Sequence, residues 1–341
     1  MLNIAELSKI KVDDLSKFIS SKISSLDHQI LLLEYKSKNN LSFGIFENKN
    51  LIAVCPVSYE KKENYNIGTF FNISLPGPLI NSNINEKKFK DILNLILDKV
   101  DDLCIKNNIV KIKINFFDLL PSGINDNKFY YLEELLHQYN YISFSLIGSR
   151  LYLKKDMKLL ESNISKGHKA IIKKEKKIYK FLSFINHKIN FEDFNKLIKN
   201  YIDFTEYSSY LFKLYCNNQI DLIYDNTNDK LFLSGVFVKV NKTVEYFLAI
   251  NSDIGGNHHS LIHNSINYYK KIGFEYMNLG VINYNSTPWF IVDKKKENIS
   301  IFKRGFGGDR YGLNIYGKYY SKDSFIKDND NYSKNYLNLM K

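Results

Sequence analysis

A repeated order of predicted elements constrains the fold of this chain more than any other feature of the sequence. In the first half, two strand patterns over 41–46 and 51–57 flank the turn 47–50. A helix with one apolar stripe follows, and then a strand with alternating apolar residues. The stripe consists of Phe89, Ile92, Leu93, Ile96, Val100, Leu103 and Cys104, and the strand carries Val110, Ile112, Ile114 and Phe116.

The second half has the same hairpin, helix and strand in the same order. Strand patterns over 231–240 and 243–250 flank the dipeptide Asn241-Lys242, and a strand over 274–279 ends the unit. The helix between them carries Leu261, Ile262, Ser265, Ile266, Tyr269 and Ile272. The repeat predicts a mixed α/β protein of two tandem domains, 1–155 and 156–341.

Only the first copy has an insertion between its hairpin and its helix. This insertion contains Leu75-Pro76-Gly77-Pro78, which is typical of a rigid loop rather than a flexible linker. With 341 residues, of which 44% are apolar and 15% aromatic, the chain is large enough to bury a core in each half.

The formal net charge of +12 favours an anionic partner such as phosphate, RNA or a membrane surface. Lysine is abundant while arginine is rare, however, and the codon bias of an AT-rich genome produces the same composition without any partner. Charge alone therefore leaves the partner open.

The cysteines and the N-terminus predict a cytoplasmic protein. Cys55, Cys104 and Cys216 are too far apart for a disulfide framework or a metal knuckle. The N-terminus lacks the apolar core of a signal peptide, and no segment approaches the ~18 apolar residues of a membrane span, so membrane contact can only be peripheral. His259 and His263 have the spacing of metal ligands, but no carboxylate or cysteine lies near them in sequence, and we expect no metal site.

The segment I-F-K-R-G-F-G-G over 301–308 is the clearest candidate for chemistry. Lys303 stands beside the ring of Phe302, and Gly305 begins a glycine-rich stretch that lets main chain approach a substrate closely. A cation fixed in this way can stabilise an oxyanion during acyl transfer. The alternative is a strand end followed by a turn, with Lys303 paired to a surface carboxylate such as Asp309.

A basic segment, N-I-S-K-G-H-K-A-I-I-K-K-E-K-K-I-Y-K over 163–180, lies between the two halves. Ser165 can cap a helix there. The helix is expected to carry Lys169, Lys173, Lys174, Lys176 and Lys177. A basic helix at a domain junction, where clefts tend to form, is a candidate phosphate site, although clustered lysines also occur on solvated helix faces.

Taken together, the order of these motifs resembles that of the FemABX-type peptidyltransferases and the broader GNAT-like acyltransferases. The shared features are the repeated unit, the helix S-K-G-H-K-A-I-I-K-K, the strand region K-K-I-G-F-E-Y-M-N-L-G and the final I-F-K-R-G-F-G-G. The resemblance covers roughly 41–316. It implies a twin GNAT fold and the transfer of amino acids or acyl groups to cell-envelope precursors.

The resemblance also implies roles for single residues. Lys303, with Phe302, falls on the catalytic pair of the family. Lys169 falls on the position that holds the acceptor's phosphates, where relatives commonly have arginine, so a point charge replaces a bidentate grip. Lys173 and His168 on the same helix are further candidates for substrate binding, together with Gly305.

A general base is less clear from the resemblance. Relatives commonly show an acidic residue where this chain has Asn115, and Asp118 is the candidate substitute. Proton removal by substrate or water remains the alternative.

No permanently bound cofactor is expected, and the acyl donor is either aminoacyl-tRNA or acyl-CoA. In acetyl-CoA-dependent GNAT proteins a small-residue loop cradles the pyrophosphate at a helix start. The equivalent loop here, 251–259, has Gly255 and Gly256, but no arginine or glutamine precedes them and histidines follow. This departure favours aminoacyl-tRNA.

The expected activity is amide formation on an amino group of a nucleotide- or lipid-linked precursor of the cell envelope or a surface glycan. The acceptor would be a phosphate-bearing amino sugar or peptide. Two alternatives remain: an acyl-CoA-dependent N-acyltransferase of a nucleotide-activated amino sugar, and a catalytically silent, basic RNA-binding module.

Overall fold

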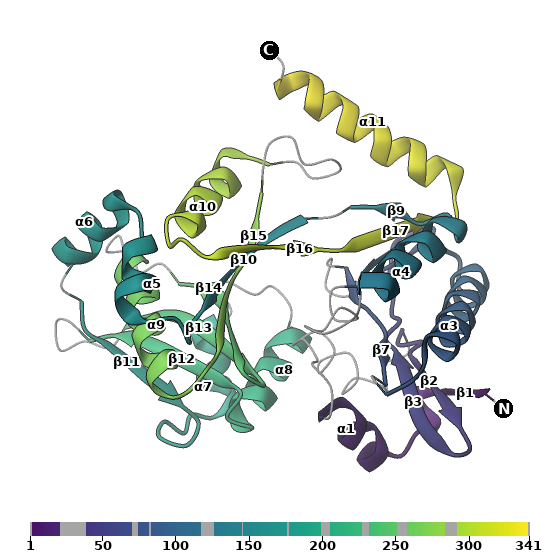
Figure 1. The fold of residues 1–341 in the computed structure, drawn as a ribbon, viewed down its shortest axis with the longest axis horizontal. Coiled ribbons are helices and arrows are strands. Elements are labelled where there is room, and N and C mark those ends of the chain that lie inside the picture. The colour runs from purple at the N-terminus through teal and green to yellow at the C-terminus, as the bar shows by residue number, and fades with distance from the viewer. Residues whose placement is uncertain are drawn as a thin grey trace. The chain divides into compact units, whose positions relative to one another are not determined.

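The computed structural model contains both helices and strands in each half of the chain (Figure 1). The structure describes residues 2–20, 39–69, 74–81, 83–116, 126–144, 146–175, 177–198, 205–226, 232–250, 258–283 and 292–339. The chain forms two compact units: the described residues of unit 1 come from 1–146 and 312–341, and those of unit 2 from 147–284 and 292–311. Among the described helices, none has the length and apolar character required to cross a membrane.

The described residues of unit 1 form two sheets. The first has the strand order β1 (Leu2–Glu6), β2 (Phe43–Glu47), β3 (Asn50–Cys55) and β7 (Leu79–Ile80). The second has the order β4 (Glu60–Lys61), β5 (Asn66–Gly68), β8 (Ile109–Asn115), β17 (Ile315–Tyr319) and β9 (Ile142–Ser143), with β6 (Leu75–Pro76) also paired to β8. The α-helices described in this unit are α1 (Val12–Ser20), α3 (Glu86–Lys106), α4 (Asp126–Gln138) and α11 (Lys322–Leu339), and a short 3-10 helix spans Leu7–Lys9.

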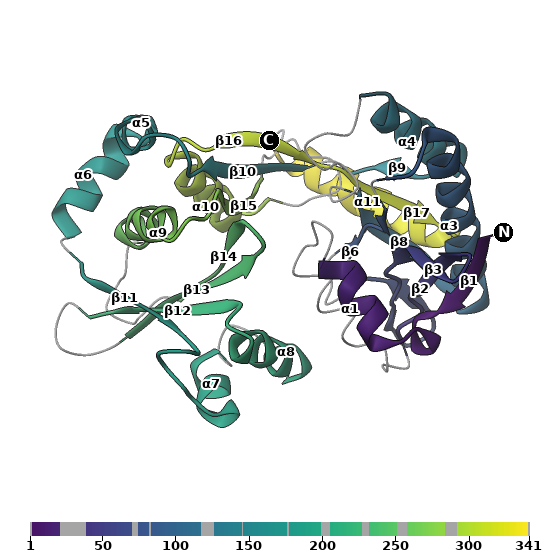
Figure 2. The same cartoon turned by 60° about the horizontal axis from the view of Figure 1, so that its bottom comes forward.

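The described residues of unit 2 form one sheet of seven strands. Their order is β11 (Tyr179–Ser183), β12 (Ile220–Asp225), β13 (Phe232–Val240), β14 (Thr243–Ala249), β15 (Tyr276–Ile282), β10 (Leu146–Tyr152) and β16 (Asp309–Leu313). Its helices are α5 (Met157–Asn163), α6 (Lys166–Glu175), α7 (Phe191–Ile198), α8 (Thr205–Cys216), α9 (His259–Lys271) and α10 (Lys294–Arg304). In Figure 2, α9 lies on one face of the sheet and α7 and α8 lie on the other.

The predicted repeat of hairpin, helix and strand is confirmed in both halves, as β2–β3, α3 and β8 and then as β13–β14, α9 and β15. The hairpin turns have the left-handed backbone that two-residue turns require, with φ values of 47° at Asn48, 70° at Lys49 and 53° at Asn241. The apolar stripe of α3 is buried as expected, except that Leu97 replaces Leu103 among the buried residues. Ile272 was wrongly placed on the stripe of α9: the helix ends at Lys271, and Ile272 is 48% exposed.

The last strand of each half lies in the sheet of the other unit. Strand β10 follows β9 along the chain, yet it lies between β15 and β16 in unit 2. Strand β17 follows β16, yet it lies between β8 and β9 in unit 1. Each compact unit thus contains chain segments from both halves of the sequence. The predicted domains 1–155 and 156–341 stay a prediction.

The insertion of the first half adds a strand to the second sheet of unit 1. Strand β8 pairs in parallel with β5 from Ile109 to Ile112, and then with β6 at Ile114 and Asn115. A Cβ on Gly77 would lie 2.6 Å from the carbonyl oxygen of Asn115, so the loop after β6 packs tightly against the end of β8. The insertion therefore covers the edge of β8 beyond its pairing with β5.

Candidate functional site

The central parallel pair of unit 2 separates along its length. Strands β14 and β15 are paired only from Thr243 and Tyr276 to Glu245 and Asn278. Beyond these residues β14 continues against β13, and β15 continues against β10 as far as Ile282. The two strands therefore diverge, and the backbone beyond their last paired residues is not joined by a ladder.

Lys303 lies at the diverging part of β15. Its ammonium group donates a hydrogen bond of 3.1 Å to the carbonyl oxygen of Val281. Gly280 has a φ of 83°, and a Cβ at this position would lie 2.9 Å from the Nζ atom of Lys303. The glycine thus provides both an unusual backbone conformation and the space that the ammonium group occupies.

The ammonium group of Lys303 is partly buried, and no acidic group of the described residues pairs with it. Burial lowers the pKa of Lys303 from 10.5 to about 8. No ion pair joins Lys303 to a carboxylate of the described residues, and Asp309 is paired with Lys155 at 3.1 Å instead. The alternative of a surface salt bridge between Lys303 and Asp309 is therefore wrong.

The segment 301–308 is a helix end and not a strand end. Asp293 caps the start of α10 by accepting a hydrogen bond of 2.7 Å from the backbone amide of Lys296. The helix continues to Arg304, and Gly307 has a left-handed φ of 69° in the turn that follows. Phe302 and Lys303 thus belong to the last helical turn.

His168 lies against this turn. Its Nε2 atom is 2.9 Å from the carbonyl oxygen of Phe302, and its ring occupies the space beside Gly305, where a Cβ would lie 2.2 Å away. The structure therefore brings together His168, Gly305, Phe302 and Lys303. The roles predicted for them stay predictions.

The predicted basic helix is α6, and it is shorter than expected. Ser165 precedes it as predicted and accepts a hydrogen bond from the backbone amide of His168. The helix ends at Glu175, so Lys177 is not helical, and Lys176 lies outside the described residues. Lys169 donates to the carbonyl oxygen of Ser162 at 3.1 Å, whereas Lys173 is exposed.

Asp118 also lies outside the described residues, as do residues 251–257 of the loop 251–259 that stands where acetyl-CoA-dependent GNAT proteins bind pyrophosphate. The helix that follows this loop, α9, is described from its first residue. The carboxylate of Glu175, at the end of α6, accepts hydrogen bonds from both the backbone amide and the hydroxyl group of Ser260. An internal anion thus occupies the positive end of α9, a feature that sequence reasoning missed.

A second feature that sequence reasoning missed is a polar row across three strands. Asn278 on β15 accepts a 2.8 Å hydrogen bond from Nε of Arg150 on β10 and donates a 3.5 Å one to Glu245 on β14. The guanidinium group of Arg150 lies over the rings of Tyr276 and Tyr311, 5.2 and 4.5 Å from their centroids. One signal in the sequence could have pointed to this row: arginine is rare, and all three arginines of the chain, Arg150, Arg304 and Arg310, belong to unit 2.

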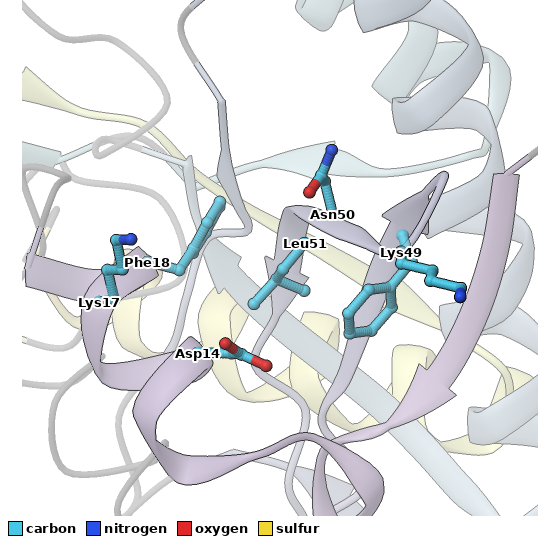
Figure 3. Close-up of a pocket in the computed structure, with 7 residues that line it drawn as sticks. Asp14, Lys17, Phe18, Lys49, Asn50 and Leu51 are labelled. Carbon is cyan, nitrogen blue, oxygen red and sulfur yellow. The ribbon is translucent and has the colours of Figure 1, made fainter.

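A pocket of unit 1 is separate from these residues. It has a volume of about 310 Å³ and lies between α1 and the hairpin β2–β3 (Figure 3). Its lining residues are Asp14, Lys17, Phe18, Phe46, Lys49, Asn50 and Leu51. None of the residues predicted for the functional site lines this pocket.

Two hairpin–helix–strand repeats in tandem, with a diverging pair of parallel strands in the second repeat, define a tandem GNAT fold. The chain resembles FemX with a TM-score of 0.62 at 9% identity, over 95% of this chain and 99% of that one. It resembles L-PGS from Bacillus licheniformis with a TM-score of 0.54 at 13% identity, over 93% of this chain and 94% of that one. The resemblance to FemABX and GNAT-like proteins is therefore confirmed at the level of the fold.

A further solved structure is a tandem GNAT protein from the clavulanic acid biosynthesis pathway. It has a TM-score of 0.53 at 8% identity, over 94% of this chain and 98% of that one. No family model and no curated protein sequence matches the chain. The relationship is thus carried by the three-dimensional structure.

Proposed function

We propose that the protein is an acyltransferase that forms an amide on an amino group of a phosphate-bearing precursor of the cell envelope or a surface glycan. The observation that carries this proposal is the partly buried ammonium group of Lys303, held at the carbonyl oxygen of Val281 beside the diverging strands β14 and β15. The tandem GNAT fold supports it, since FemX, L-PGS and the clavulanic acid pathway protein share that fold.

The proposed chemistry needs one well-placed cation. The acceptor amine attacks the activated carbonyl carbon of the donor, a tetrahedral oxyanion forms, and the donor's alcohol or thiol leaves. Lys303 donates an N–H hydrogen bond to the oxyanion, and a donor of this kind contributes about 10²-fold or more to the rate. With a pKa of about 8, most Lys303 side chains carry the charge at pH 7.

The proposed donor is aminoacyl-tRNA, and one contact of the described residues supports it over acyl-CoA. A pyrophosphate group binds at a helix start because the unpaired amides there carry partial positive charge. At the start of α9 the carboxylate of Glu175 already accepts the amide of Ser260, at 3.0 Å. A second anion at this place would be repelled, whereas the lysines of α6, Lys169 and Lys173 among them, suit a nucleic acid or a phosphate-bearing acceptor.

A donor competition tests this proposal. The protein is incubated with radiolabelled aminoacyl-tRNA or with radiolabelled acetyl-CoA, each with a pool of nucleotide-linked amino sugars and muropeptide precursors. We expect label transfer from the charged tRNA, sensitivity to ribonuclease, and transfer lowered by about 10²-fold or more in the Lys303→Met variant.

Two results would overturn the proposal in different ways. Rapid transfer from acetyl-CoA without RNA would establish the acyl-CoA-dependent N-acyltransferase of amino sugars as the function. Tight, salt-sensitive binding of tRNA with no transfer from either donor would indicate a silent RNA-binding module.

A further inference from the structure

The last turn of α10 is held by a side chain from another helix. Carbonyl groups at a helix end lack partners within the helix and need other donors. Gly305 supplies amide contacts to Ile301 and Phe302, and the Nε2 atom of His168 lies 2.9 Å from the same Phe302 carbonyl oxygen. His168 therefore contacts the residue that directly precedes Lys303.

His168 itself is fixed from two sides. The backbone amide of Ser165 donates to the carbonyl oxygen of Gly305 at 2.8 Å, and the hydroxyl group of Ser165 accepts from the amide of His168. The ring of His168 lies 4.9 Å from Phe306 and 4.3 Å from His259, measured between ring centroids. The start of α6 and the end of α10 thus pack together around this imidazole.

The contact with Phe302 determines where the imidazole carries its proton. A carbonyl oxygen only accepts hydrogen bonds, so Nε2 of His168 must be the protonated nitrogen. Burial and the neighbouring His168 lower the pKa of His259, which favours a neutral partner ring. The Nε2–H group of His168 can therefore hold the carbonyl group of Phe302.

We propose that His168 is a positioning residue, which holds the last turn of α10 so that the ammonium group of Lys303 stays at the carbonyl oxygen of Val281. The proposal rests on the proposed function, because it assigns His168 to Lys303 instead of to the substrate. Gly305 has a complementary role, since any larger residue would displace the imidazole. Misplacement of a catalytic group by about 1 Å is enough to lower a rate substantially.

Four variants test this role. His168→Phe keeps a ring but removes the donor, and His168→Gln keeps an N–H donor. Gly305→Ala places a Cβ 2.2 Å from the imidazole without changing His168. His263→Phe is the matched control, because His263 lies on α9 and faces Glu161 at 3.6 Å.

The readout independent of activity is the labelling of Lys303 by acetic anhydride as a function of pH, followed by peptide mass spectrometry. We expect His168→Phe and Gly305→Ala to move the titration of Lys303 upward from about 8 by about one pH unit, because a displaced ammonium group gains water. His168→Gln and His263→Phe are expected to titrate like the unchanged protein. Folding of each variant is checked by thermal unfolding.

In acyl transfer, His168→Phe is expected to lower kcat by about tenfold with the acceptor KM nearly unchanged, and His168→Gln is expected to restore most of it. Unchanged labelling of Lys303 in folded His168→Phe and Gly305→Ala proteins would overturn the proposal. A change of the acceptor KM alone in His168→Phe would also overturn it, because it would indicate that His168 binds substrate. Failure of every acyl donor would defeat the proposed function, while the labelling would still decide the role of His168.

Discussion

Replacing Lys303 by methionine is expected to remove most of the acyl transfer and yet not to destabilise the protein. Methionine keeps the unbranched stem and removes the charge. The fall of the pKa from 10.5 to about 8 means that the charge of Lys303 destabilises the folded protein by roughly 3 kcal/mol at neutral pH, and methionine removes this cost. The variant also loses the hydrogen bond to Val281, which offsets about 1.5 to 3 kcal/mol of that gain. We expect an unchanged or slightly higher free energy of unfolding and a rate lowered by about 10²-fold or more.

The sign of the pH dependence is a further check on this variant. The unfolded chain binds a proton at Lys303 more tightly than the folded protein does, so the destabilisation is complete below pH 8 and disappears as the pH rises towards 10.5. Urea unfolding of both proteins at pH 7 and pH 10 measures the difference.

The matched control is Lys295→Met, which makes the same substitution at an exposed position of α10. It is expected to change neither rate nor stability appreciably. A Lys303→Met protein with an unchanged kcat and a lower melting temperature would show that Lys303 has only a structural role.

The two halves of the sequence, 1–155 and 156–341, are expected not to fold when they are produced separately. Unit 1 needs β17, whose residues Ile315 and Tyr316 are 7% and 1% exposed and which lies between β8 and β9. Unit 2 needs β10, which supplies Leu151 to its core between β15 and β16. Loss of either strand leaves two strands with unpaired backbone groups and exposes side chains worth about 1.5 to 3 kcal/mol each.

Circular dichroism and size-exclusion chromatography of each fragment, alone and mixed, test this expectation. The mixture is expected to regain the native secondary structure. A control chain that joins 1–146 to 312–341 through a flexible linker contains the strands of unit 1 and is expected to fold. A monomeric 1–155 fragment with cooperative unfolding would show that the exchanged strands are dispensable.

The order of elements could be predicted from the sequence because hairpin turns and apolar stripes are local signals. The exchange of β10 and β17 could not, since the same order along the chain is compatible with each strand pairing inside its own half. Pairing between distant segments depends on tertiary contacts that no local pattern records.

The candidate site shows the same distinction. Lys303, Phe302 and Gly305 are neighbours in sequence, so their combination could be recognised directly. Glu175 reaches Ser260 from a helix 85 positions away, and no periodicity links these two residues. The end of α10 was open to interpretation as a strand end, because glycines mark turns after helices and strands alike.

The most direct test of the central claim is the pH dependence of the single-turnover rate in the unchanged protein, Lys303→Met and Lys303→Arg. If the charged form of Lys303 stabilises the oxyanion, the rate of the unchanged protein falls as the pH rises through about 8, and this fall is absent in Lys303→Met. Arginine keeps its charge throughout, so Lys303→Arg is expected to lose the fall while retaining part of the rate. Deprotonation of the acceptor's ammonium group to the nucleophilic amine raises the rate with pH in all three proteins alike. A rate that instead rises through pH 8 only when Lys303 is present would contradict the claim and make the neutral amine a general base.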